Sequence, residues 1–213
     1  MYYYCIFINI CRLNYIIHLM NILFTNQYQV LAHLLGENEY CAQATKHFSG
    51  LQESLYSEIL SHLKETDEDV PYQHGQFEYY TRTVQGLSYK IHCRKPVAGG
   101  PEEIILDENE VAKGHEYCDV SSFIPSPDHT LLAYAVDHSG YETYTIYIKN
   151  LSTGELLADS TEGSDGNVVW DRDSSRLYYR TMDDEHRPDQ MHMHVLGTNQ
   201  SEDACLYTED DGR

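Results

Sequence analysis

A repeat with a period of 45 residues places the strongest limit on how this chain can fold. The residues that recur are Asp128, Leu132 and Tyr134, matched by Asp173, Leu177 and Tyr179. In both copies a polar turn leads into a strand, and an apolar strand comes before it, Phe123-Ile124 in the first copy and Val168-Val169-Trp170 in the second. One blade of a β-propeller has about this length. The repeat therefore predicts four strands per unit and favours a propeller over a β-sandwich.

The segments around the repeat also have the two-residue period of strands. Phe77 to Arg82 and Tyr89 to Arg94 flank a turn at Gln85-Gly86, which predicts a hairpin. Asn150 to Gly154 has the composition of a turn, and Met191 to Val195 alternates methionine with histidine.

Two further strands are expected inside the first repeat. Leu132, Tyr134 and Val136 would share one face of a strand, and Tyr144, Ile146 and Ile148 would share one face of the next. No helical pattern separates these strands, so we expect a mainly β region.

The region before Pro71 is helical in pattern instead. Val30 to Cys41 predicts a short helix, and Ser49 with Gln52 has the spacing of a capping box that would begin a second one. This second helix is expected to bury one stripe, made of Leu51, Leu55, Ile59 and Leu63. The acidic residues between Glu65 and Asp69, followed by Val70-Pro71, predict its end and a domain boundary.

Residues 1–29 differ in composition from the rest, because they carry one charged side chain, Arg12, and no acid. Polar residues interrupt their apolar stretch too often for a membrane anchor, and no small-residue cleavage site marks a signal peptide. We expect three segments: an atypical apolar leader at 1–29, absent from the native domain, a helical segment at 30–70, and an incomplete β-propeller at 71–213.

The charge balance bears on the partners. Fourteen Lys and Arg residues face 34 Asp and Glu residues, a formal net charge of −20, which disfavours nucleic acid as a partner. The hydrophobic content of 41% and the 19 tyrosines are too high for a disordered acidic chain. Six cysteines without Cys-x-x-Cys spacing indicate free thiols and a reducing, cytoplasmic location, with no membrane partner.

Two short stretches imitate catalytic motifs. Gly163-Ser164-Asp165-Gly166 is the nearest approach to the Gly-x-Ser-x-Gly turn of a hydrolase nucleophile, but its spacing is wrong and we expect a loop. Asp137-His138-Ser139-Gly140 contains three residue types of a catalytic triad, but neighbouring residues of a strand point to opposite faces. Turn chemistry explains it better, so no catalytic residue is predicted.

Two histidines have a spacing that could bind a metal ion. His192 and His194 could approach one ion, with His186 or Asp189 as a third ligand, but a polar outer strand face is the simpler interpretation. Cys93 and Cys118 fit structural thiols. The acidic run Glu65 to Asp69 lacks the glycine and final glutamate of a calcium loop. We predict no metal and no cofactor.

The sequence resembles the oligopeptidase B group of the prolyl oligopeptidase family of serine peptidases, from about Val30 to Gly197. The stretches that carry the resemblance are Leu51 to Ile59, Val70-Pro71-Tyr72, Tyr79 to Arg82, Ile91 to Arg94, Ile105 to Glu110, Gly114 to Tyr117, Ser126-Pro127-Asp128, Leu132-Ala133-Tyr134, Leu151 to Leu156, Val168-Val169-Trp170 and Arg187-Pro188.

The resemblance implies a seven-bladed propeller that caps an α/β-hydrolase domain, admits short peptides and serves cleavage after Lys or Arg. The helical segment would pack on the hydrolase domain. We expect about three four-stranded blades here and no hydrolase domain, so the chain alone would be inactive. Its partners would be that missing domain and short basic peptides. The alternative is a stand-alone propeller-type interaction module.

Overall fold

The computed structural model describes residues 27–209, so the predicted leader lies almost wholly outside the described residues. The chain divides into two compact units, Met1–Lys64 and Glu65–Arg213, which are described separately.

The first unit is helical in its described part. It contains α2 (Gln27–Thr45), the 3-10 helix η1 (Lys46–Phe48) and α3 (Ser49–Ser61), so both expected helices are confirmed. The capping box is wrong, because η1 runs directly into α3: Phe48 is the N-cap with helical backbone angles, and it makes no side-chain capping bond. Ser49 is therefore the first helical residue.

The apolar stripe of α3 is not buried. Leu51, Leu55 and Ile59 of α3, and Leu63 just beyond its end, keep between 46% and 62% of their surface exposed, and no residue of α3 is buried. The expected periodicity is present, but a helix needs a packing partner to bury its stripe.

The second unit begins with a four-stranded antiparallel sheet in the order β1-β2-β3-β4. Its strands are β1 (Tyr72–His74), β2 (Phe77–Arg82), β3 (Ile91–Pro96) and β4 (Glu103–Asp107), and α4 (Glu108–Val111) follows. The predicted hairpin is confirmed as β2 and β3, with Tyr80 opposite Cys93. The unit starts ahead of Pro71, because the Asp69 amide donates to the Thr81 carbonyl at 2.8 Å, which brings the acidic run alongside β2.

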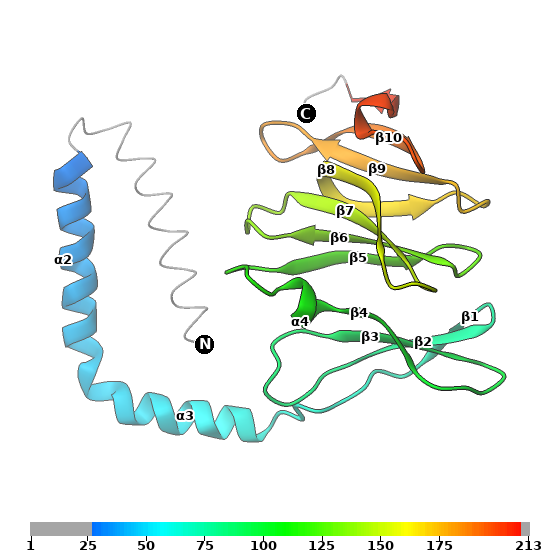
Figure 1. The fold of residues 1–213 in the computed structure, drawn as a ribbon. Coiled ribbons are helices and arrows are strands. Elements are labelled where there is room, and N and C mark those ends of the chain that lie inside the picture. The colour runs from blue at the N-terminus through cyan, green and yellow to red at the C-terminus, as the bar shows by residue number, and fades with distance from the viewer. Residues whose placement is uncertain (1–26, 210–213) are drawn as a thin grey trace. The chain divides into compact units, whose positions relative to one another are not determined.

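The second sheet is also antiparallel and has seven strands in the order β11-β10-β9-β8-β7-β6-β5 (Figure 1). The strands are β5 (Asp119–Pro125), β6 (Leu131–Asp137), β7 (Tyr144–Asn150), β8 (Leu156–Trp170), β9 (Arg176–Met182), β10 (Pro188–Val195) and β11 (Ala204–Thr208), with η2 (Gln200–Glu202) before the last.

Strand β8 serves two four-stranded groups. Its first part pairs with β7, its second part pairs with β9, and Ser164 has partners on both sides, Tyr144 and Thr181. Gly163 and Gly166 have φ values of 74° and 87°, which only glycine adopts readily, and they let the strand bend there. The loop predicted at Gly163 to Gly166 is wrong, since these residues lie inside β8.

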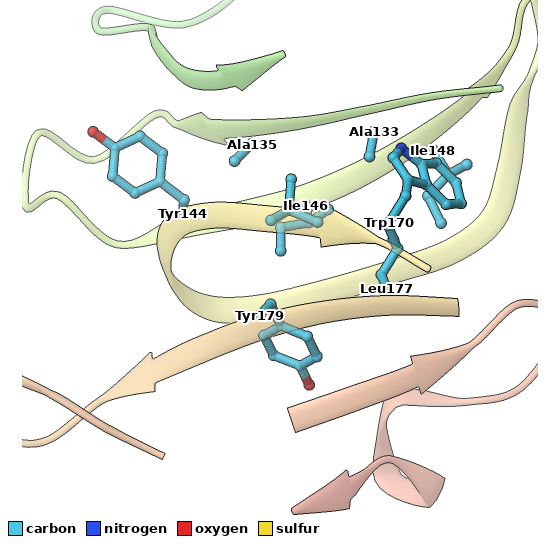
Figure 2. Close-up of a cluster of buried hydrophobic side chains, with 9 residues drawn as sticks. Ala133, Ala135, Tyr144, Ile146, Ile148, Trp170, Leu177 and Tyr179 are labelled. Carbon is cyan, nitrogen blue, oxygen red and sulfur yellow. The ribbon is translucent and has the colours of Figure 1, made fainter. Parts of the chain in front are cut away.

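The faces of β6 show how the groups stack. Ala133 and Ala135 belong to a core with Ile146 of β7 and with Trp170 and Leu177 of the next group (Figure 2).

The opposite face of β6 forms a second core. Leu132, Tyr134 and Val136 pack with Cys118 and with Leu106 of β4. Alternate residues of one strand thus face different neighbours, as the period of two requires. Three four-stranded blades stacked face to face result, which confirms the mainly β, partial-propeller prediction.

The repeat is a repeat of backbone geometry as well as of sequence. Leu132 and Leu177 are 0% and 1% exposed at equivalent positions of β6 and β9. His129 and Ser174 take left-handed φ values of 62° and 57° in the turns that lead into these strands. Such values are uncommon outside glycine, and the matching pair shows that both turns have the same form.

Candidate functional site

Side chains at the boundary between two neighbouring blades, called a joint below, form hydrogen bonds that connect the blades. Between the first and second blades, Arg94 of β3 donates from Nη1 to the His129 carbonyl at 2.7 Å. The same guanidinium donates from Nε to Glu103 at 2.7 Å and lies over the Phe77 ring at 4.1 Å. The Tyr79 hydroxyl is 2.8 Å from Nδ1 of His129. The left-handed turn of one blade is thus held by side chains of the blade before it.

The second and third blades are joined by a different set of hydrogen bonds, although Ser174 stands at the repeat position of His129. Trp170 of β8 donates from Nε1 to the Ile124 carbonyl of β5 at 2.9 Å. The Asp128 amide donates to the Ser174 hydroxyl at 3.3 Å, which links the two repeated turns directly. Hydrogen bonds in such half-buried positions fix the register between the packed sheets.

A buried polar network joins the third blade to the outer part of the second. His194 of β10 is 0% exposed, and its Nδ1 lies 2.7 Å from Oδ1 of Asp203. Its Nε2 lies 3.3 Å from Oδ1 of Asp159, in the part of β8 that pairs with β7. The Tyr179 hydroxyl donates to the other oxygen of Asp203 at 2.7 Å. The polar outer strand face predicted for the histidines is wrong for His194, which is buried with carboxylates from two other segments around it.

The two histidines of β10 do not share a partner. Nε2 of His192 is 3.2 Å from the Thr181 hydroxyl, whereas His194 lies between Asp159 and Asp203. Within residues 27–209, no cluster of three or more His, Cys, Asp and Glu side chains has the arrangement of a metal site.

The two catalytic look-alikes make the contacts of turns and bends. Ser164 is buried, and its hydroxyl accepts from the Gly166 amide at 3.0 Å. Asp137 accepts from both the amide and the hydroxyl of Ser139 at 2.6 Å, while His138 contacts the Tyr117 carbonyl at 3.1 Å. Neither serine has an imidazole placed to take its proton.

The charge of Asp137 is stabilised by its turn. Burial alone raises the pKa of this carboxyl, but hydrogen bonds from Ser139, Glu142 and Gly140 outweigh it and leave the pKa below its usual value of 3.8. This is the electrostatic signature of a carboxylate that caps a turn.

The thiols in the sheets are unreactive in character. Cys93 and Cys118 are buried, and burial raises the pKa of each thiol to about 11. Since the thiolate is the nucleophile, both are almost entirely in the inert form at neutral pH.

No helix among residues 27–209 is both long enough and apolar enough to cross a bilayer.

Comparison with known proteins identifies the blade stack. Residues 25–213 match the family described as prolyl oligopeptidase, N-terminal beta-propeller domain. Dipeptidyl aminopeptidase BI of Pseudoxanthomonas mexicana is 36% identical over 200 residues, which covers 86% of this chain and 28% of that protein. Protease 2 of Moraxella lacunata is 34% identical over 191 residues, with the same coverage of 86% and 28%.

Solved structures agree with these relatives. Oligopeptidase B from Leishmania major superimposes with a TM-score of 0.81 at 40% identity, covering 85% of this chain and 26% of that one. Oligopeptidase B from Trypanosoma brucei, solved with covalently bound antipain, gives 0.79 at 42% identity, with coverage of 85% and 26%.

The chain thus spans roughly a quarter of the length of the proteins that it matches, whether by sequence or by structure. The family match includes all of the described residues, in both units. The chain therefore belongs to the prolyl oligopeptidase family, and its residues 25–213 match the N-terminal β-propeller domain of that family.

Proposed function

We propose that this chain is the substrate-gating propeller portion of an oligopeptidase-B-like serine peptidase that hydrolyses short peptides after Lys or Arg. It would work with an α/β-hydrolase domain, and the chain alone would be inactive. The free thiols of Cys41, Cys93, Cys118 and Cys205 support a cytoplasmic location for it.

The observation that carries the proposal is the match of the blade stack to oligopeptidase B. The L. major enzyme shares 40% identity with this chain, and the superposition covers 85% of the chain. It involves 26% of the enzyme's length, so that enzyme has a large part with no counterpart here. The expected specificity for Lys and Arg follows from the family resemblance, and the enzyme's hydrolase part would supply it.

The expected inactivity of the chain alone rests on the local geometry. An acyl-transfer serine needs a base within hydrogen-bond reach and a strained turn that exposes its hydroxyl. Ser164 is buried and accepts from a backbone amide, and Ser139 donates to the carboxylate of Asp137. Neither contact activates a nucleophile.

A hybrid enzyme tests the proposal. Residues 72–213 would replace the matching segment of L. major oligopeptidase B, and the unmodified chain would be assayed beside it. We expect the hybrid to cleave short Arg and Lys reporters and to spare folded proteins, while the chain alone neither cleaves them nor reacts with a serine-directed phosphonate. Stoichiometric phosphonate labelling of the chain alone would overturn the inactivity, and a folded hybrid that degrades large substrates would overturn the gating role.

A further inference from the structure

A cavity of about 120 Å³ is lined by residues of the first two blades and of the segment that leads into the first. This exceeds the roughly 10–15 Å³ that one water molecule requires, so a group of side-chain size fits. Four aromatic residues line it, namely Tyr72, Tyr79 and Tyr80 of the first blade and Phe123 of the second. Asp69 and His92 complete the polar part of the wall, which contains no Lys or Arg side chain.

The hydroxyl protons of this wall are largely committed elsewhere. Tyr80 donates to Glu102 at 2.5 Å, and the Thr81 hydroxyl at the edge of the cavity donates to the Asp69 carboxylate. The Tyr79 hydroxyl is engaged with Nδ1 of His129. What the wall offers a ligand is therefore mainly hydrogen-bond acceptors and aromatic rings.

His92 is a buried part of the cavity wall that is fixed by its neighbours. The residue is 8% exposed, its ring is stacked on Phe123 at 4.1 Å, and its Nε2 lies 2.6 Å from the Glu108 carboxylate. Nδ1 has no hydrogen-bond partner, but it is closed to solvent, so a ligand in the cavity does not reach it, and His92 contributes to the wall through the other atoms of its ring.

We propose that this cavity binds a compact organic cation, a primary ammonium group on a short aliphatic stem such as a lysine side chain. The stem would lie against the aromatic rings, which attract cations placed within about 6 Å of their faces. The ammonium protons would be accepted by the Asp69 carboxylate, the one acidic group of the cavity wall. This site lies in the propeller itself and uses none of the catalytic chemistry, so it does not depend on the proposed peptidase role.

The probe is n-butylammonium chloride, added to the full chain while amide and histidine nitrogen resonances are followed by NMR. We expect saturable shifts at Tyr79 to Thr81 and at the His92 nitrogens. 1-Butanol has the same stem without the charge, and potassium chloride at equal ionic strength reports general salt effects. Neither control should reproduce the shifts.

Paired variants localise the charge. Asp69→Asn keeps an acceptor for the Thr81 hydroxyl but removes the charge, and we expect it to weaken butylammonium binding about two- to fivefold, the usual range for an exposed charge. Asp67→Asn removes an acidic charge two residues away, outside the cavity wall, and should leave binding unchanged. Tyr72→Leu, which removes one ring, should also weaken it.

Three results would overturn the proposal. They are equal binding of butanol and butylammonium, shifts that follow ionic strength across the whole chain, and equal effects of Asp69→Asn and Asp67→Asn. Spectra of each unliganded variant verify that the fold is retained, so loss of binding in a misfolded variant would not be counted as support.

Discussion

The indole Nε1–H of Trp170 donates to the Ile124 carbonyl at 2.9 Å and joins β8, where it enters the third blade, to β5 of the second blade. Trp170 is the chain's one tryptophan, and only 8% of it is exposed. One side chain therefore contributes both to the core between these blades and to the hydrogen bonding across their joint.

Trp170→Phe should keep much of the apolar contact and remove the hydrogen bond to the Ile124 carbonyl. We expect the free energy of unfolding to fall by about 1–3 kcal/mol, the cost of one lost hydrogen bond plus some lost contact. Urea unfolding followed by far-ultraviolet circular dichroism measures this. The matched control is Val169→Ala, on the opposite face of the strand, where Val169 is 60% exposed. This variant should lower the free energy of unfolding by only about 0.5 kcal/mol. Equal losses for both variants would contradict the role of the joint.

His194→Ala should destabilise the contact between the second and third blades strongly. The side chains of His194, Asp159 and Asp203 are 0%, 8% and 2% exposed, so removal of the imidazole leaves two buried carboxylates without the group that lies between them. Breaking a buried pair in this way typically costs about 3–5 kcal/mol. His192→Ala, on the same strand but half-buried, is the control and should cost clearly less in the same urea titration. A larger loss for His192→Ala would show that the network is not the main support of β10.

Acid should weaken the fold partly through Asp137. Its pKa in the folded chain lies below the ordinary value of 3.8, so the stability that it contributes is fully present above that value and is lost as the pH falls through the folded pKa. Asp137→Asn should lower stability at pH 7 and reduce the slope of stability against pH below about pH 4, measured by thermal unfolding at a series of pH values. An unchanged slope would mean that other carboxylates carry the acid sensitivity.

The described cysteines should react with a thiol reagent at very different rates. Cys41 and Cys205 are exposed, while Cys93 and Cys118 are buried with a pKa of about 11. Mass spectrometry after brief labelling at pH 7.5 should find the first two modified and the last two only after urea is added. Early labelling of Cys93 would show that the first blade opens readily.

The outer face of the third blade should promote association of the isolated chain. Val169, Met191 and Val195 are 60%, 40% and 38% exposed, and strand register places them on one face, away from the core that contains Trp170. Exposed apolar faces of this kind favour oligomers. Sedimentation at micromolar concentration should show species larger than a monomer, together with binding of a hydrophobic dye.

Charge on that face provides the control. Val169→Lys should shift the distribution toward monomer, whereas Leu156→Lys, at a residue 54% exposed elsewhere on β8, should not. A cooperative, dye-free monomer for the unmodified chain would remove the physical basis of this prediction.

Local patterns were enough to predict most of the elements. The helices before Pro71, the hairpin of β2 and β3 and the alternation in β6 and β7 all depend on residues close together in the chain, and the 45-residue repeat is one such local pattern that occurs twice. A period of two or of 3.6 residues is a property of the backbone itself, so it is visible before any tertiary contact is known. The turn at Asp137 was also predictable, since its carboxylate bonds residues two to five positions later.

The errors have a different physical origin. The capping box at Ser49 failed because η1 already supplies helical backbone before it, and the loop at Gly163 to Gly166 failed because both sides of that segment pair with strands from different blades. The partners of His194 lie 9 and 35 residues away, beyond any local pattern.

The sequence by itself therefore determined the period, order and polarity of the strands and helices, together with the turns that connect them. Only the tertiary structure decided which face of each strand meets which blade, and it left the stripe of α3 exposed while it buried His194 between two carboxylates. The reason is that burial and long-range hydrogen bonds each require two segments of the chain to come into contact. The stacking of whole blades, and no single stretch of residues, brings those segments together.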